Sequence, residues 1–147
     1  CIVTEAADLK LAARRIVFGK FLNCGQTCVA PDYIYVQDSV KDQLVKELIN
    51  ETKRQFTDSP LNSNDYGKIV NEKHFNRISG LTIIAKSILV VHQMRIEPTI
   101  MDNVTFDDAV MQEEIFGPLM PILTFHSIEE AAALLMHTCT RLPVYIH

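Results

Sequence analysis

Apolar residues recur at intervals of three and four in four parts of the chain, which is the spacing of a helix with one buried face. The predicted helices cover residues 8–22, residues 38–54, residues 71–81 and a segment that starts at Ser127. The second helix has the most regular apolar stripe, formed by Val40, Leu44, Val45, Leu48 and Ile49. The regularity of this stripe predicts a helix that packs against the core.

Polar residues mark the ends of two of these helices. Asp38 or Ser39 is placed to cap the second helix, and Lys53 and Arg54 suit its C-terminus, where cations are favoured. Ser127 begins an S-x-x-E capping box ahead of the fourth helix. These residues can satisfy the free backbone groups that every helix leaves at its ends.

Short runs rich in apolar, β-branched or aromatic residues separate the helices and predict strands. They lie at residues 1–3, 32–38, 86–91, 97–100, 119–125 and 143–147. Residues 57–65, TDSPLNSND, have the composition of a loop. The alternation of helices and apolar strands predicts an α/β layered fold in one domain, with a mainly parallel sheet and flanking helices.

Composition adds limits on partners. The chain has 147 residues, 48% of them hydrophobic and 22% charged, with a net charge of −4, so neither disorder nor a basic surface for nucleic acid is expected. No apolar run approaches the ~20 residues that span a bilayer, and the N-terminus lacks the pattern of a secretory signal. We therefore expect a small-molecule partner, no nucleic acid, no membrane span and a cytoplasmic location. Because the chain begins at Cys1 without Met, we also expect it to be a piece of a larger protein.

Cysteines are the first candidates for chemistry. The four cysteines lie at 1, 24, 28 and 139, a spacing that fits neither a disulfide framework nor a zinc site. The five histidines, at 74, 92, 126, 137 and 147, also lack ligand spacing, so no metal is expected.

Three roles are open for the pair in FLNCGQTCVAPDY, residues 21–33: buried small hydrophobes, a redox or metal pair, or one nucleophile. Cys28 lies in a helix-to-strand connection, a location where ligand crevices form in α/β folds, and Gly25 allows close approach of backbone. Cys24, beside apolar Phe21 and Leu22 at the helix end, is better suited to packing.

At these residues the chain resembles the aldehyde dehydrogenase superfamily. FLNCGQTC matches the cysteine active-site signature of that superfamily, and VMQEEIFGPLMPI, residues 110–122, resembles its second hallmark. GQTCVAPDY, RIEPTI (residues 95–100) and DYGKIVNEKHFNRISGL (residues 65–81) resemble the class 3 branch, which includes fatty and aromatic aldehyde dehydrogenases. The motifs occur in the family's order over most of residues 1–135.

The resemblance implies oxidation of an aldehyde to a carboxylic acid with NAD or NADP, through a cysteine thiohemiacetal and thioester. It makes Cys28 the catalytic nucleophile, with its backbone N–H as one oxyanion donor, Glu114 the contact to the cofactor ribose and Phe116 the contact to the nicotinamide. If residues 114–116 are extended, both side chains point to one side. Taken singly, Glu113 and Glu114 would be solvated surface charges and Phe116 a core residue.

The resemblance also implies what the chain lacks. Residues 1–147 correspond to a partial catalytic, cysteine-bearing domain, and the nucleotide-binding domain, the general-base glutamate, the oxyanion asparagine and the oligomerisation segment of the family are absent from them. We therefore expect the isolated chain to be inactive and its parent to be a homodimer. The alternative is a truncated relative that acts as a non-catalytic interaction or thiol-redox module, with a reversible bridge between Cys24 and Cys28.

Overall fold

The computed structural model describes residues 1–84 and 91–138, and its main sheet is parallel throughout. Four strands lie in the order β1-β2-β6-β5, and each neighbouring pair is parallel. Their bounds are β1 Ile2–Val3, β2 Ile34–Gln37, β5 Thr99–Met101 and β6 Leu119–Phe125. The predicted α/β fold with a mainly parallel sheet is confirmed.

Strand β6 matches the predicted strand 119–125 in full. Its burial is nearly continuous because both faces of the sheet are covered. A separate antiparallel pair, β3 Val91–His92 and β4 Arg95–Ile96, precedes β5. The predicted strands at 86–91 and 143–147 lie outside the described residues, apart from Val91.

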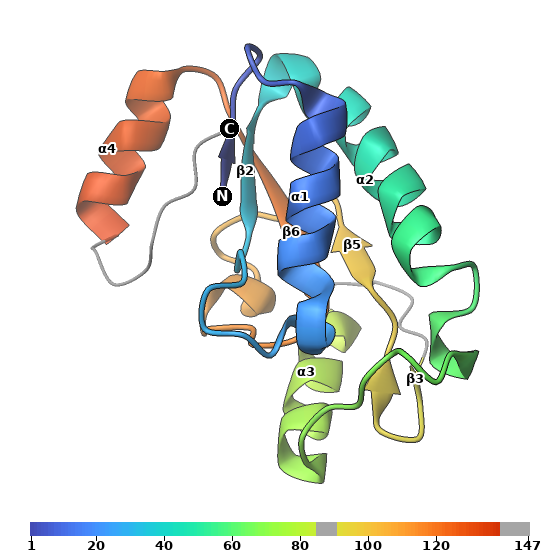
Figure 1. Cartoon of the computed structure of the whole chain (residues 1–147). Helices are drawn as coiled ribbons and strands as arrows, with labels where there is room; N and C mark the ends of the chain where they lie inside the picture. The colour runs from blue at the N-terminus through green and yellow to red at the C-terminus, as the bar shows by residue number, and fades with distance from the viewer. Residues whose placement is uncertain (85–90, 139–147) are drawn as a thin grey trace.

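Helices cover the sheet on both faces (Figure 1). Helices α1 Leu9–Phe21 and α2 Lys41–Phe56 pack on one face, and α4 Ile128–Thr138 packs on the other. Alternation along β2 explains the division, since Val36 joins the core under α1 and α2 whereas Tyr35 joins the core under α4. Helix α3 Glu72–Ile84 lies beyond one end of the sheet, with its own apolar cluster around Ile78.

The predicted start of α2 is wrong. Asp38–Val40 form a separate 3-10 turn, and α2 has no side-chain cap. The two predicted capping residues have other partners: Ser39 Oγ donates to Glu5 Oε2 at 3.2 Å, and Asp38 contacts the ring of His126. Within the predicted stripe, Leu44 and Leu48 are fully buried, but Ile49 is 43% exposed.

The capping box before α4 is present in a shifted form. Glu130 N donates to Ser127 Oγ at 3.3 Å, as predicted. The Glu130 carboxylate accepts from the N–H of His126 at 2.8 Å, one residue before the cap. Both side chains therefore still satisfy backbone donors at the helix start.

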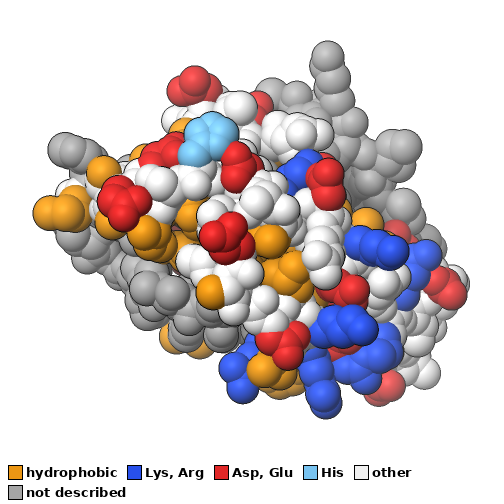
Figure 2. All heavy atoms as spheres, turned by 90° about the horizontal axis from the view of Figure 1, so that it is seen from above, with side chains coloured by type: hydrophobic (Ala, Val, Ile, Leu, Met, Phe, Trp, Pro, Cys, Tyr) orange, Lys and Arg blue, Asp and Glu red, His pale blue; other side chains and the backbone are white. Residues whose placement is uncertain are grey.

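Among the described residues, no helix combines the length and apolar character needed to cross a bilayer. Figure 2 shows the molecule from above, with acidic side chains spread over this face and basic side chains gathered toward one side. Charges of both signs thus share this face.

Candidate active site

The two segments predicted to carry chemistry meet at one edge of the sheet. The loop with Cys28 leads into β2, and residues 112–118 lead into β6. Because β2 and β6 are adjacent and parallel, with Ile34 opposite Ile122, the segments that precede them lie at the same edge. This is the end of the sheet at which its parallel strands begin. The expectation that Cys28 lies at the usual ligand crevice of open α/β sheets is therefore wrong, because that crevice lies at the carboxyl ends.

Gly25 and Gly117 bring the two segments into direct backbone contact. A Cβ atom on Gly25 would lie 2.2 Å from Gly117 O and 3.1 Å from Lys20 O, and Gly25 has φ +74°. The position therefore requires glycine both for space and for conformation. A second link joins the same segments, since the Asp32 carboxylate accepts a hydrogen bond from Ile115 N at 3.0 Å.

The chain reverses between α1 and Cys28 through three successive residues with left-handed backbone. Asn23 has φ 51° and Cys24 φ 57°, followed by Gly25. For a residue with a side chain, this conformation costs roughly 1 kcal/mol or more. The surrounding contacts must offset that cost, and such strain is common where a loop presents a functional group.

Gln26 supplies much of that support. Its side-chain Nε2 donates to Asn23 O and Lys68 O, each at 3.1 Å, and its Oε1 accepts from Val70 N at 2.9 Å. The amide thus ties the loop both to itself and to residues 68–70. The Gly-Gln pair of the motif is explained by these contacts.

Cys28 and Cys24 have opposite environments. Cys28 is exposed in a turn closed by Ala30 N donating to Thr27 O at 3.0 Å, whereas Cys24 is 2% exposed. Burial raises the pKa of the Cys24 thiol, although contacts with Tyr66 and Gly67 act in the opposite direction. The packing role predicted for Cys24 is confirmed, and both thiols are free.

Glu114 and Phe116 do not lie on a strand. Phe116 has φ 46°, so the extended alternation that would turn both side chains to one side does not apply here. Glu114 is exposed, Ile115 between them is buried, and Phe116 is half-buried. The carboxylate of Glu114 is accessible to hydroxyl donors, and part of the Phe116 ring is accessible to an apolar or aromatic group.

Lys20 was not predicted as a site residue. It is 1% exposed, and its Nζ donates to Asp32 O at 3.3 Å. Burial lowers its pKa to about 8, while the nearby charges of Asp32 and Glu114 act to raise it. Helical periodicity places Lys20 on the buried face of α1, four residues after Ile16. Its charge argues against that position, because lysines are almost never fully buried.

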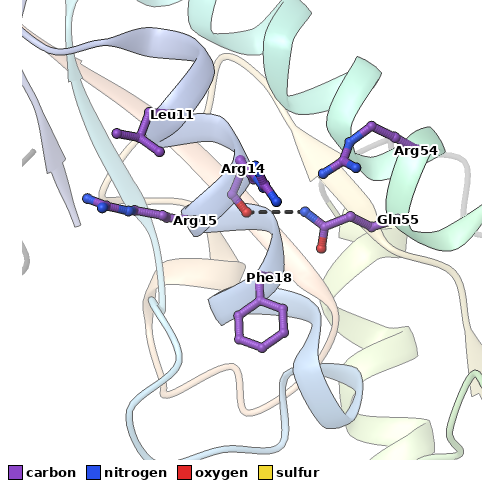
Figure 3. A pocket seen from close by; sticks show the side chains of 6 residues that line it. All are labelled: Leu11, Arg14, Arg15, Phe18, Arg54 and Gln55. Carbon is purple, nitrogen blue, oxygen red and sulfur yellow. Dashed lines mark hydrogen bonds between the residues drawn. The ribbon is translucent and has the colours of Figure 1, made fainter.

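Within residues 1–84 and 91–138, no group of three or more His, Cys, Asp and Glu side chains is arranged to hold a metal ion. A pocket of about 510 Å³ lies between α1 and α2, as Figure 3 shows. It is lined by Leu11, Arg14, Arg15, Phe18, Arg54 and Gln55. Gln55 donates across it to Arg14 O at 3.2 Å. None of the predicted site residues line this pocket.

Known proteins are similar to this chain over nearly its whole length. A family model described as the aldehyde dehydrogenase family matches residues 1–146. The 4,4'-diaponeurosporen-aldehyde dehydrogenase of Staphylococcus aureus is 46% identical over 151 residues, covering 99% of this chain and 33% of that protein. The Rattus norvegicus protein named aldehyde dehydrogenase, dimeric NADP-preferring, is 42% identical over 153 residues, with coverage of 99% and 33%. The chain spans about a third of the length of these relatives.

Solved structures give the same relationship. The substrate-bound state of Staphylococcus aureus AldH has a TM-score of 0.86 and 46% identity, over 92% of this chain and 31% of that one. An NADP-dependent glyceraldehyde-3-phosphate dehydrogenase from Bacillus halodurans, complexed with NADP, has a TM-score of 0.77 and 37% identity, over 90% and 29%.

Proposed function

The chain belongs to the aldehyde dehydrogenase family, and on that premise we propose that it carries the nucleophile of an enzyme that oxidises aldehydes to carboxylic acids. One observation carries the proposal: exposed Cys28 lies on a loop whose backbone contacts the Glu114–Gly117 segment through Gly25. The loop and the segment are further linked by the Asp32–Ile115 hydrogen bond. A nucleophile and a cofactor contact need this proximity, because the atom attacked by sulfur must also reach the cofactor.

Cys28 performs the covalent part of the reaction. Its thiolate sulfur bonds to the carbonyl carbon of the aldehyde, and the carbonyl electron pair moves to oxygen, giving a thiohemiacetal anion. The backbone N–H of Cys28 is one donor for that oxygen. The carbon then loses hydride and the C=O bond re-forms as a thioester. Water adds to the thioester, the sulfur leaves, and a carboxylic acid is released.

Glu114 and Phe116 hold the cofactor on this side of the site. The exposed Glu114 carboxylate can accept hydrogen bonds from a ribose diol, and Phe116 offers part of an aromatic ring. When bound, a nicotinamide dinucleotide supplies the acceptor for the hydride. A NADP-preferring relative and a structural neighbour complexed with NADP support a nicotinamide dinucleotide as the cofactor. The proposal includes both NAD and NADP.

Residues 1–147 form part of a catalytic domain in this proposal, and the remaining parts belong to a longer parent protein. The general base, the second oxyanion donor and most of the dinucleotide site would lie in those parts. Each of the first two is commonly worth ~10²-fold or more in rate, so the isolated chain is inactive. The dimeric relative supports a homodimeric parent, and the class 3 resemblance supports aliphatic and aromatic aldehydes as substrates.

The test measures formation of reduced dinucleotide at 340 nm, by the ordinary absorbance of NAD(P)H, with aldehyde substrates. Protein from the complete reading frame is compared with its Cys28→Ser and Cys24→Ala variants and with the 147-residue chain. We expect turnover by the parent and by Cys24→Ala, and at least ~10³-fold less from Cys28→Ser and from the isolated chain. Turnover that survives in Cys28→Ser would remove Cys28 from the mechanism.

A further inference from the structure

Arg77 of α3 binds three consecutive residues of the segment before β6. Its Nη1 donates to the Glu113 carboxylate at 3.1 Å and to Glu114 O at 3.1 Å, and its Nη2 donates to Ile115 O at 2.6 Å. The side chain is 23% exposed, so these bonds are partly shielded from water. A guanidinium has several donors in a fixed plane, which suits it to hold two neighbouring carbonyl groups at once.

The bound segment depends on such contacts because it has no strand pairing of its own. Residues 112–118 are irregular, and Phe116 has φ 46°. On the other side, Ile115 N donates to the Asp32 carboxylate at 3.0 Å. Arg77 therefore holds the carbonyl of the peptide group on each side of Ile115, and Asp32 holds the N–H of the first of these two groups.

Apolar packing also holds the segment at Ile115. Ile115 is 1% exposed, and the neighbour of Arg77 on α3, Ile78, packs over Gly117, where a Cβ atom would lie 2.6 Å from Ile78 Cδ1. Helix α3 thus contacts the segment through two successive residues. Glu114 and Phe116 are the residues directly before and after Ile115. Holding Ile115 in place therefore also holds the backbone from which their side chains extend.

We propose that Arg77 is a positioning residue that, opposite Asp32, holds Glu114 and Phe116 in place to receive the dinucleotide. This inference rests on the proposed function of those two residues. The hydrogen bonds of Arg77 go to residues 113–115 and not to the loop that carries Cys28. Its loss should therefore weaken binding of the dinucleotide while leaving the reactivity of Cys28 unchanged.

The test uses protein from the complete reading frame and three variants: Arg77→Ala, Arg77→Lys and Glu113→Gln. We expect Arg77→Ala to raise KM for the dinucleotide about tenfold, the order expected when a charged hydrogen bond is lost. Arg77→Lys should be intermediate, because an ammonium cannot span the two carbonyl groups. Glu113→Gln should stay within about twofold, since it removes only the exposed ion pair.

A second readout separates positioning from general damage to the fold. The rate at which iodoacetamide alkylates Cys28, mapped by mass spectrometry, should be the same in Arg77→Ala as in the parent. Hydrogen exchange of the 113–117 amides should be faster in the variant. The inference would be overturned if Arg77→Ala changed neither KM for the dinucleotide nor hydrogen exchange of residues 113–117. It would also be overturned if Arg77→Ala changed the alkylation rate of Cys28 by as large a factor as it changed KM. If Arg77→Ala does not fold, Arg77→Lys decides, and wild-type behaviour of Arg77→Lys overturns the inference.

Failure of the proposed function gives a different result. In that case the parent oxidises no aldehyde, yet hydrogen exchange at residues 113–117 still reports whether Arg77 anchors the segment. Parent turnover with wild-type kinetics in Arg77→Ala and Arg77→Lys leaves the proposed function standing and removes only the role of Arg77.

Discussion

Lys20 places an amine in the interior of the molecule, behind the loop that carries Cys28. Burial lowers its pKa from 10.5 to about 8 in the folded state. Between pH 8 and 10.5 the unfolded chain therefore binds more protons at this residue than the folded chain. The contribution of Lys20 to stability rises with pH in that window, and the cost of burying its charge is fully present below pH 8.

Replacement of Lys20 by Met tests this. We expect the stability of Lys20→Met relative to wild type to fall as pH rises from 8 to 10.5, by up to roughly 3 kcal/mol for a shift of this size. Urea unfolding of both proteins at several pH values measures it. The difference between them cancels the contributions of Cys24 and Tyr66, whose pKa values burial raises. A difference independent of pH would show that the amine is not buried as described.

Single residues also differ in how far the sequence could identify them. Cys28, Glu114 and Phe116 were proposed from motifs, because their neighbours in sequence form the pattern. Arg77 and Asp32 could not be found in that way, since their bonds to Ile115 span 38 and 83 residues. Only the fold brings such partners together.

At the scale of elements, the contact between the Cys28 loop and the segment before β6 depends on one glycine. Gly25→Ala should destabilise the protein by at least about 1–2 kcal/mol from backbone conformation alone, with a further cost from the close contact with Gly117 O. Thermal or urea unfolding measures the change.

Gly80 offers a matched control within α3. A Cβ atom there would have no neighbour within 4 Å, so Gly80→Ala should stabilise the helix by about 0.5–1 kcal/mol. If Gly25→Ala were as stable as Gly80→Ala, the two segments would not be in the contact described.

Elements with strong periodicity were predictable, and their boundaries were less so. Helix α1 and strand β6 match their predicted ranges closely, because one has a clear apolar face and the other is a continuous apolar run. The start of α2 was missed because Asp38 and Ser39 bond to His126 and Glu5, which are distant in sequence. The left-handed turn at Phe116 likewise has no signature in local composition.

At the scale of the whole molecule, the chain places the residues of our proposed active site at the end of the sheet where its parallel strands begin. Parallel pairing of β2 with β6 brings the loop of Cys28 beside the segment of Glu114 and Phe116. Helix α3 supports that segment from below in Figure 1. The chain spans about a third of its relatives, and in our proposal the parent supplies the remaining catalytic groups.

The most direct measurement is mass spectrometry of the parent protein quenched in acid during turnover of an aldehyde with a nicotinamide dinucleotide. We predict an acyl group on the peptide that contains Cys28, absent when the dinucleotide is omitted and absent from Cys28→Ser. Turnover of the aldehyde without acylation of Cys28, or with the acyl group on another cysteine, would contradict the assignment of Cys28 as the nucleophile.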